Sequence, residues 1–89
     1  MMVKWSECVE KMEKLAKEMG NIDIIAGKRV SNHVDDWYLC IAFCRIHQEN
    51  STEYVTWLYN ATLGDNGSFN NGHYFSNYDN ARHDFEQRT

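Results

Sequence analysis

The last third of the chain, from Tyr54 to Arg88, places the strongest constraint on the fold. It has the pattern of a strand, a long polar turn, a second strand and a short helix. Aromatic residues crowd both strands: Tyr54, Trp57 and Tyr59 in the first, and Phe69, Tyr74 and Phe75 in the second. A hairpin with a helix laid on it is a compact folding unit, and this one is expected to display an aromatic surface.

The opening segment has the periodicity of an amphipathic helix. Its apolar residues recur at steps of three and four: Trp5, Cys8, Val9, Met12, Leu15, Ala16 and Met19. Gly20 follows at the position where a helix commonly ends in the left-handed conformation. The pattern predicts a surface helix with one face on a core.

Between these two units, alternating and β-branched residues predict further strands over 22–30, 37–47, 53–60 and 68–75. Gly27 suggests a bulge in the first, a polar turn is expected over 48–52, and a bend over 70–72. Ser76 and Asp79 have the spacing of a capping box for a helix that ends near Arg88. The chain is therefore predicted to be one domain, residues 1–89. Its fold class is α+β, with two layers and an antiparallel sheet of three to four strands flanked by an N-terminal and a C-terminal helix.

Composition narrows the environment and the partners. The 89 residues include 13 acidic and 9 basic side chains, and a net charge of −4 argues against indiscriminate binding to duplex DNA. The three cysteines have no disulfide-framework spacing, and no apolar run has the length of a membrane span or secretion signal. A cytoplasmic protein with reduced thiols and no membrane partner is expected.

The sequence predicts neither a metal site nor another cofactor. Cys40, Cys44 and His47 have a spacing that suggests zinc, but two strand residues four apart lie roughly 13 Å from each other. Buried free cysteines are the better interpretation. Near the C-terminus, His73, His83 and Asp84 offer the elements of acid–base chemistry. No nucleophile is spaced to join them, and we expect a protein that is not an enzyme.

The surplus of aromatic residues predicts a partner surface, because Trp, Tyr and Arg commonly anchor interfaces. The candidate anchors are Trp37, Trp57, Tyr59 and Tyr74. Four carboxylates are candidates to enter a basic nucleic-acid channel on the partner: Asp35, Asp36, Glu53 and Asp65. About half of the aromatic residues are expected to pack in the core, and the rest to form the partner surface. Two alternatives remain open: a single-stranded nucleic-acid-binding sheet face, and a small-molecule sponge with a dimer pocket around His73 and Tyr74.

A resemblance points to one kind of partner. The segments Tyr54-Val55-Thr56-Trp57 and Gly72-His73-Tyr74-Phe75, together with Ala81, Asp84-Phe85 and Arg88, resemble small phage and prophage proteins of low-GC Gram-positive bacteria. The resemblance covers about the C-terminal third and carries no catalytic motif. Some such accessory proteins inhibit host immunity, including anti-CRISPR proteins. It implies an inhibitor that binds a host protein or nucleoprotein complex. A homodimer is expected on a separate ground, because a domain of 89 residues has modest stability and a dimer interface would supplement it.

Overall fold

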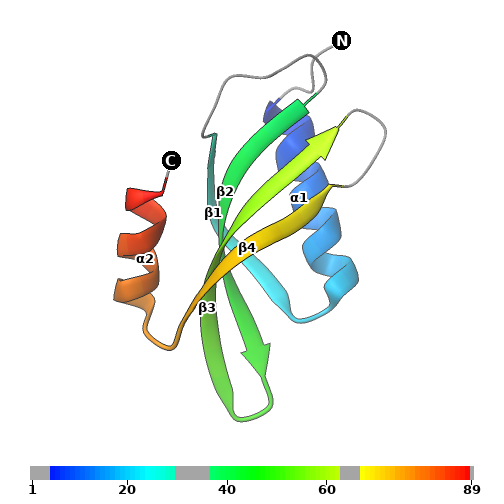
Figure 1. Cartoon of the computed structure of the whole chain (residues 1–89). Coiled ribbons are helices and arrows are strands. Elements are labelled where there is room, and N and C mark those ends of the chain that lie inside the picture. The colour runs from blue at the N-terminus through cyan, green and yellow to red at the C-terminus, as the bar shows by residue number, and fades with distance from the viewer. Residues whose placement is uncertain (1–4, 30–36, 63–66, 89) are drawn as a thin grey trace.

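The computed structural model describes residues 5–29, 37–62 and 67–88, and it confirms the predicted α+β fold (Figure 1). Along the chain, one helix precedes four consecutive strands and a second helix follows them. In order they are α1 (Trp5–Met19), β1 (Ile22–Arg29), β2 (Trp37–Gln48), β3 (Ser51–Thr62), β4 (Ser68–Phe75) and α2 (Tyr78–Gln87). Asp35, Asp36 and Asp65 lie outside the described residues.

The four strands form one antiparallel sheet in the order β1-β2-β3-β4, so every strand pairs with its neighbour in sequence. Strands β2 and β3 pair without interruption from Trp37 opposite Thr62 to Gln48 opposite Ser51. Only residues 49 and 50 remain between these strands, so the expected five-residue turn over 48–52 is wrong. The pairing of polar residues extends both strands into that segment.

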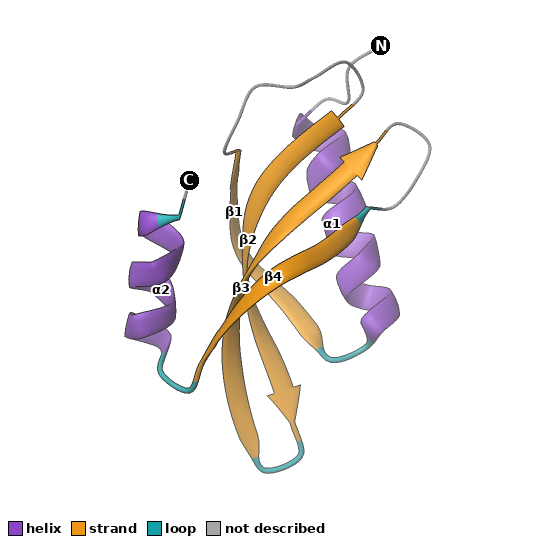
Figure 2. Cartoon of the chain, viewed as in Figure 1, coloured by secondary structure: helices purple, strands orange, loops and turns teal. Residues whose placement is uncertain are grey.

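The helices lie on opposite faces of the sheet (Figure 2). We call these the α1 face and the α2 face. Since neighbouring residues of a strand point to opposite sides, Ala42 belongs to the α1 face and Phe43 to the α2 face. The fold thus has a helical layer on each side of the sheet, one layer more than the two expected from sequence.

The main core lies beneath α1. Cys8, Met12 and Ala16 are buried there, as the predicted stripe requires, while Met19 at the end of the helix is 48% exposed. The sheet contributes Ile22, Cys40, Ala42, Cys44, Ile46, Val55, Trp57 and Tyr59. Gly20 ends the helix at φ +93°, and its N–H donates to the carbonyl of Ala16 over 3.2 Å. This confirms the predicted role of Gly20.

Both edge strands contain a β-bulge. In β1 the register shifts between Ile24 and Ala26, so Ile25 is the inserted residue and the bulge predicted at Gly27 is misplaced by two residues. In β4 the shift lies between Asn70 and His73, where the sequence predicted a bend. Asn71 has φ +51° there, a left-handed conformation that asparagine adopts more readily than most residues.

Helix α2 begins one residue later than the capping-box pattern indicated. Asn77 has extended backbone angles, and its side-chain oxygen accepts from the N–H of Asn80 over 3.1 Å. Asn77 is therefore the N-cap, in place of Ser76. The predicted contacts of the helix are confirmed: Ala81 is buried, and the rings of Tyr78 and Phe85 lie 5.4 and 5.6 Å from the ring of Phe43.

Candidate functional site

Four aromatic side chains run across β3 and β4 on the α1 face. We call Tyr59, Phe69, Trp57 and Tyr74 the aromatic row. The rings of Trp57 and Phe69 are stacked with centroids 4.7 Å apart, and Tyr74 meets Trp57 edge-on at 6.2 Å. Tyr59 completes the row, with its ring 5.3 Å from that of Phe69. Stacked and edge-on geometries are those that aromatic pairs prefer.

Gly72 makes this arrangement possible. A Cβ atom added to Gly72 would lie 2.7 Å from Nε1 of Trp57 and 2.8 Å from Cε1 of Tyr74. Both distances are shorter than any normal van der Waals contact, so a side chain here would push the two rings apart. The absence of a side chain therefore lets Trp57 and Tyr74 meet across the bulge.

The row is buried on β3 and more exposed on β4, the edge strand. Tyr59 is fully buried, Trp57 is 7% exposed and Tyr74 is 55% exposed. The burial of Trp57 and Tyr59 makes them core residues and removes both as surface anchors in this conformation. Helix α1 lies against β1, on the side of the sheet away from β4. This position explains why the outer end of the row stays open.

Two further predicted partner residues, Glu53 and Trp37, lie in β3 and β2. Glu53 is partly exposed in β3, on the same face as Tyr74 but near the β2–β3 turn. Trp37 begins β2, opposite Thr62, and only its backbone is described. The structure therefore brings Trp57, Tyr59 and Tyr74 together, and Glu53 lies on the same face two residues from Val55, the strand partner of Tyr74.

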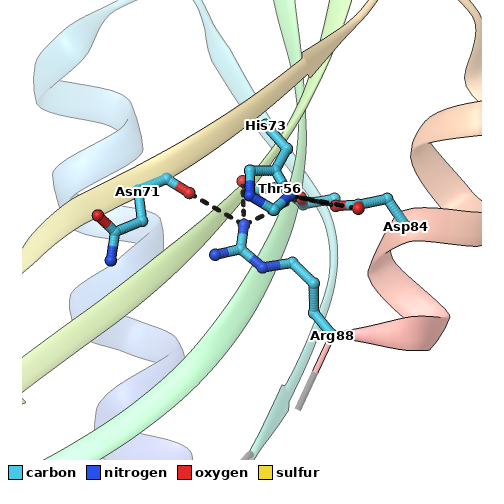
Figure 3. Close-up of polar contacts among 5 residues, drawn as sticks. All are labelled: Thr56, Asn71, His73, Asp84 and Arg88. Atoms are coloured by element: carbon cyan, nitrogen blue, oxygen red, sulfur yellow. Dashed lines mark hydrogen bonds and ion pairs between the residues drawn. The ribbon is translucent and has the colours of Figure 1, made fainter.

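A polar cluster occupies the opposite face of the same two strands (Figure 3). The Thr56 hydroxyl donates to Oδ2 of Asp84 over 2.5 Å, and Nδ1 of His73 lies 3.0 Å from the same oxygen. Nη1 of Arg88 donates to the carbonyl oxygens of Thr56 and Asn71 over 2.8 and 3.0 Å. These contacts fasten the last turn of α2 and its C-cap residue to β3 and to the bulge of β4.

The cluster favours the charged form of Asp84. Burial by itself would raise the pKa of this carboxyl, but the hydrogen bonds from Thr56 and His73 and the positive charge of Arg88 outweigh it. The net result is a pKa below the usual range for aspartate. Asp84 therefore acts as the acceptor at the centre of the cluster.

The contacts of the cluster differ from those of a nucleophilic site. Such a site needs a hydroxyl or thiol hydrogen-bonded to its base. Thr56 is fully buried and donates to Asp84 rather than to His73. His83 is exposed on α2. The described contacts thus join His73 to Asp84 as a linkage between strand and helix, without a hydroxyl aligned on the imidazole.

Sequence reasoning grouped His73 with Asp84 but missed Thr56 and Arg88. Two signals were present. Asp84 and Arg88 are four residues apart, which places their side chains along one side of a helix. Thr56 is the only residue of its face between Tyr54 and Leu58, and His73 lies directly opposite it in β4. His73 and Tyr74 are neighbours in one strand and point to opposite faces, so a pocket within one chain would not contain both.

The three cysteines are buried and free. Cys40 and Cys44 point to the α1 face, and burial raises the pKa of Cys44 to about 12. Across residues 5–29, 37–62 and 67–88, no group of three His, Cys, Asp or Glu side chains is placed to hold a metal ion.

No family model, curated protein or solved structure matches this chain at a significant level. Among the described helices, neither is long and apolar enough to cross a membrane. The argument for function therefore depends on the geometry of the chain itself.

Proposed function

We propose that this chain is a non-enzymatic interaction protein that binds a protein partner through the exposed end of the aromatic row. The observation that supports it is Tyr74, a half-exposed ring held against Trp57 on an edge strand. An aromatic side chain whose position is set by its neighbours loses little conformational freedom on binding, which suits an interface anchor.

The position of Tyr74 adds to this proposal. Among the described residues, β4 is the last strand of the sheet and no further strand pairs with its outer backbone groups. Edge strands are common sites of pairing with another chain. A partner that meets Tyr74 could therefore also contact the backbone of β4, and the bulge at Asn71 and Gly72 would limit how far a regular strand could extend along it.

The resemblance to phage accessory proteins suggests the biological setting. We propose a phage-encoded inhibitor of a host defence complex of the CRISPR type, or of another nucleic-acid-processing complex, acting in the host cytoplasm by occupying its target. An acidic chain, with net charge −4, suits a target whose surface is basic because it handles nucleic acid. Asp35, Asp36, Asp65 and Glu53 remain the proposed carboxylates for that contact.

The test compares two tyrosines of similar exposure on opposite faces. Tyr74 is 55% exposed on the α1 face and Tyr78 is 41% exposed on α2. The wild type, Tyr74→Ala and Tyr78→Ala chains are expressed in a Gram-positive host whose CRISPR system targets a plasmid, and transformation by that plasmid is counted. We expect the wild type and Tyr78→Ala to restore transformation and Tyr74→Ala to lose the effect.

Binding is measured in parallel with tagged chains in nuclease-treated lysate. An interface anchor contributes about 2 kcal/mol or more, so Tyr74→Ala should weaken capture of the partner about 30-fold or more. Circular dichroism verifies that both variants are folded. Equal activity of all three chains would refute the surface assignment. A partner that disappears with nuclease would instead favour the single-stranded nucleic-acid alternative.

A further inference from the structure

The two thiols of Cys8 and Cys40 are in direct contact. Their Sγ atoms are 3.0 Å apart, and both residues are fully buried between α1 and β2. One sulfur donates its hydrogen to the other, although the residues are 32 positions apart in the chain. Such a contact between distant thiols is unlike the environment of Cys44, which is buried among apolar residues of the same core.

We propose that Cys8 and Cys40 form a redox-modification site, in which peroxide converts the thiol pair to a disulfide that joins α1 to β2. The proposal is independent of the interaction surface at Tyr74. It rests on the sulfur–sulfur distance, on burial that excludes other thiols, and on the position of each cysteine in a regular element.

The environments of the two sulfurs assign their roles. Cys8 lies in the first turn of α1, where the helix dipole favours a thiolate. The hydrogen bond from Cys40 and the nearby charge of Lys11 lower the pKa of Cys8 despite its burial. The same contact and burial raise the pKa of Cys40. Cys8 is therefore the attacking thiolate and Cys40 the thiol that resolves the intermediate.

The reaction consumes one hydrogen peroxide. The Cys8 thiolate attacks one peroxide oxygen, the O–O bond breaks, and hydroxide leaves while Cys8 becomes a sulfenic acid. The sulfur of Cys40 then attacks the sulfur of Cys8, the S–O bond breaks, and the Cys40 proton leaves with the hydroxyl as water. In total two thiols and one peroxide give one disulfide and two waters, and the two electrons lost by sulfur reduce the peroxide.

Burial makes the reaction dependent on motion of α1. The first helical turn must separate transiently from the sheet for peroxide to reach Cys8, and helix ends open more readily than helix centres. Once formed, the bond closes a loop that includes β1, and it restricts the unfolded chain. Oxidation should therefore hold α1 on the sheet and raise the melting temperature by about 10 °C or more.

The experiment treats the folded, reduced chain with hydrogen peroxide, then unfolds it in the presence of N-ethylmaleimide. Intact mass gives the number of alkylated thiols, and a tryptic digest identifies any linked peptides. We expect adducts to fall from three to one, the survivor being Cys44, with a peptide linking Cys8 to Cys40. Cys44→Ala should form the same link, and Cys8→Ala and Cys40→Ala should not. A phosphine reductant should reverse the rise in melting temperature.

Three results would overturn the proposal. The first is that all three thiols of the folded chain remain alkylatable after a peroxide treatment that forms disulfides in the unfolded chain. The second is a link that involves Cys44 or joins two chains. A link that forms equally fast in the unfolded chain would also count against a site created by the fold. Cys44→Ala removes a buried thiol from the same core but leaves the Cys8–Cys40 pair intact. It therefore shows whether a link missing in Cys8→Ala or Cys40→Ala reflects the lost thiol or merely disturbed packing.

Discussion

Helix α1 meets the sheet through thiols and aliphatic side chains, whereas α2 meets it through rings and a polar cluster. Under α1 the buried residues are Cys8, Met12 and Ala16. Under α2 only Ala81 of the helix is buried, and the attachment depends on Phe43 and on hydrogen bonds to Thr56. Non-directional packing thus holds one helix, and directional contacts hold the other.

Because of this difference, the attachment of each helix to the sheet should respond differently to mutation and to acid. Apolar packing depends on volume and is nearly independent of pH. A partly buried polar cluster depends on its donors and acceptors having their partners, and on the ionisation of its acid. The two faces should therefore be separable by mutation and by acid.

The largest effect is expected on the α1 face, from Met12→Ala. Met12 is 1% exposed at the centre of the helix, and its truncation would leave a cavity between α1 and the sheet. The free energy of unfolding should fall by about 2–5 kcal/mol. Urea unfolding measures it, with Met19→Ala, at a site 48% exposed, as the control. Equal losses for both variants would contradict a core centred under α1.

On the α2 face, Thr56→Val should lower the free energy of unfolding by about 1–3 kcal/mol. The variant preserves shape but removes the hydroxyl that donates to Asp84 and accepts from Arg88, so each of these groups loses one of its hydrogen bonds. Thr52→Val, at an exposed position of the same strand, is the matched control and should change stability little. The comparison is refuted if the buried substitution is as harmless as the exposed one.

Acid should weaken the α2 attachment through Asp84. Because its folded-state pKa is lowered, the charged carboxyl stabilises the fold fully above the unfolded pKa of about 3.9. That contribution is lost as the pH falls through the folded value. The difference in unfolding free energy between wild type and Asp84→Asn should thus shrink as the pH falls below about 4. A difference that does not vary with pH would show that ionisation of Asp84 is irrelevant.

The smallest effect is expected outside the cluster, from Arg82→Ala. Arg82 pairs with Glu86 over 3.9 Å, and both side chains are more than half exposed. Exposed pairs of this spacing contribute about 0.3–0.5 kcal/mol, which is close to the error of an unfolding curve. Arg88→Ala, which removes the hydrogen bonds to Thr56 and Asn71, should lower stability more. If Arg82→Ala proves the more harmful, the cluster is not what holds α2.

Sequence reasoning succeeded where a pattern repeats along one element. The three- and four-residue spacing of apolar residues defined α1. The terminal helices and the antiparallel order followed from the same kind of evidence.

Contacts between distant elements could not be predicted in this way. Whether Trp57 or Thr56 faces a helix depends on which side each helix packs, and strand alternation does not contain that information. The contact between Cys8 and Cys40 joins residues 32 positions apart, and the positions of both bulges depend on the pairing strand as well as on local sequence.

The bulge of β4 determines which face of the sheet each later residue of the strand occupies. In a regular strand, residues separated by an odd number of positions point to opposite faces, yet Phe69 and Tyr74 both touch Trp57. The extra residue at the bulge restores the match. The same residues in a regular strand without the bulge would turn Tyr74 toward α2 and His73 toward α1, whereas deleting Asn71 would remove the extra residue and leave both side chains on their present faces. The bulge therefore determines which side chains this protein presents on each face of its edge strand.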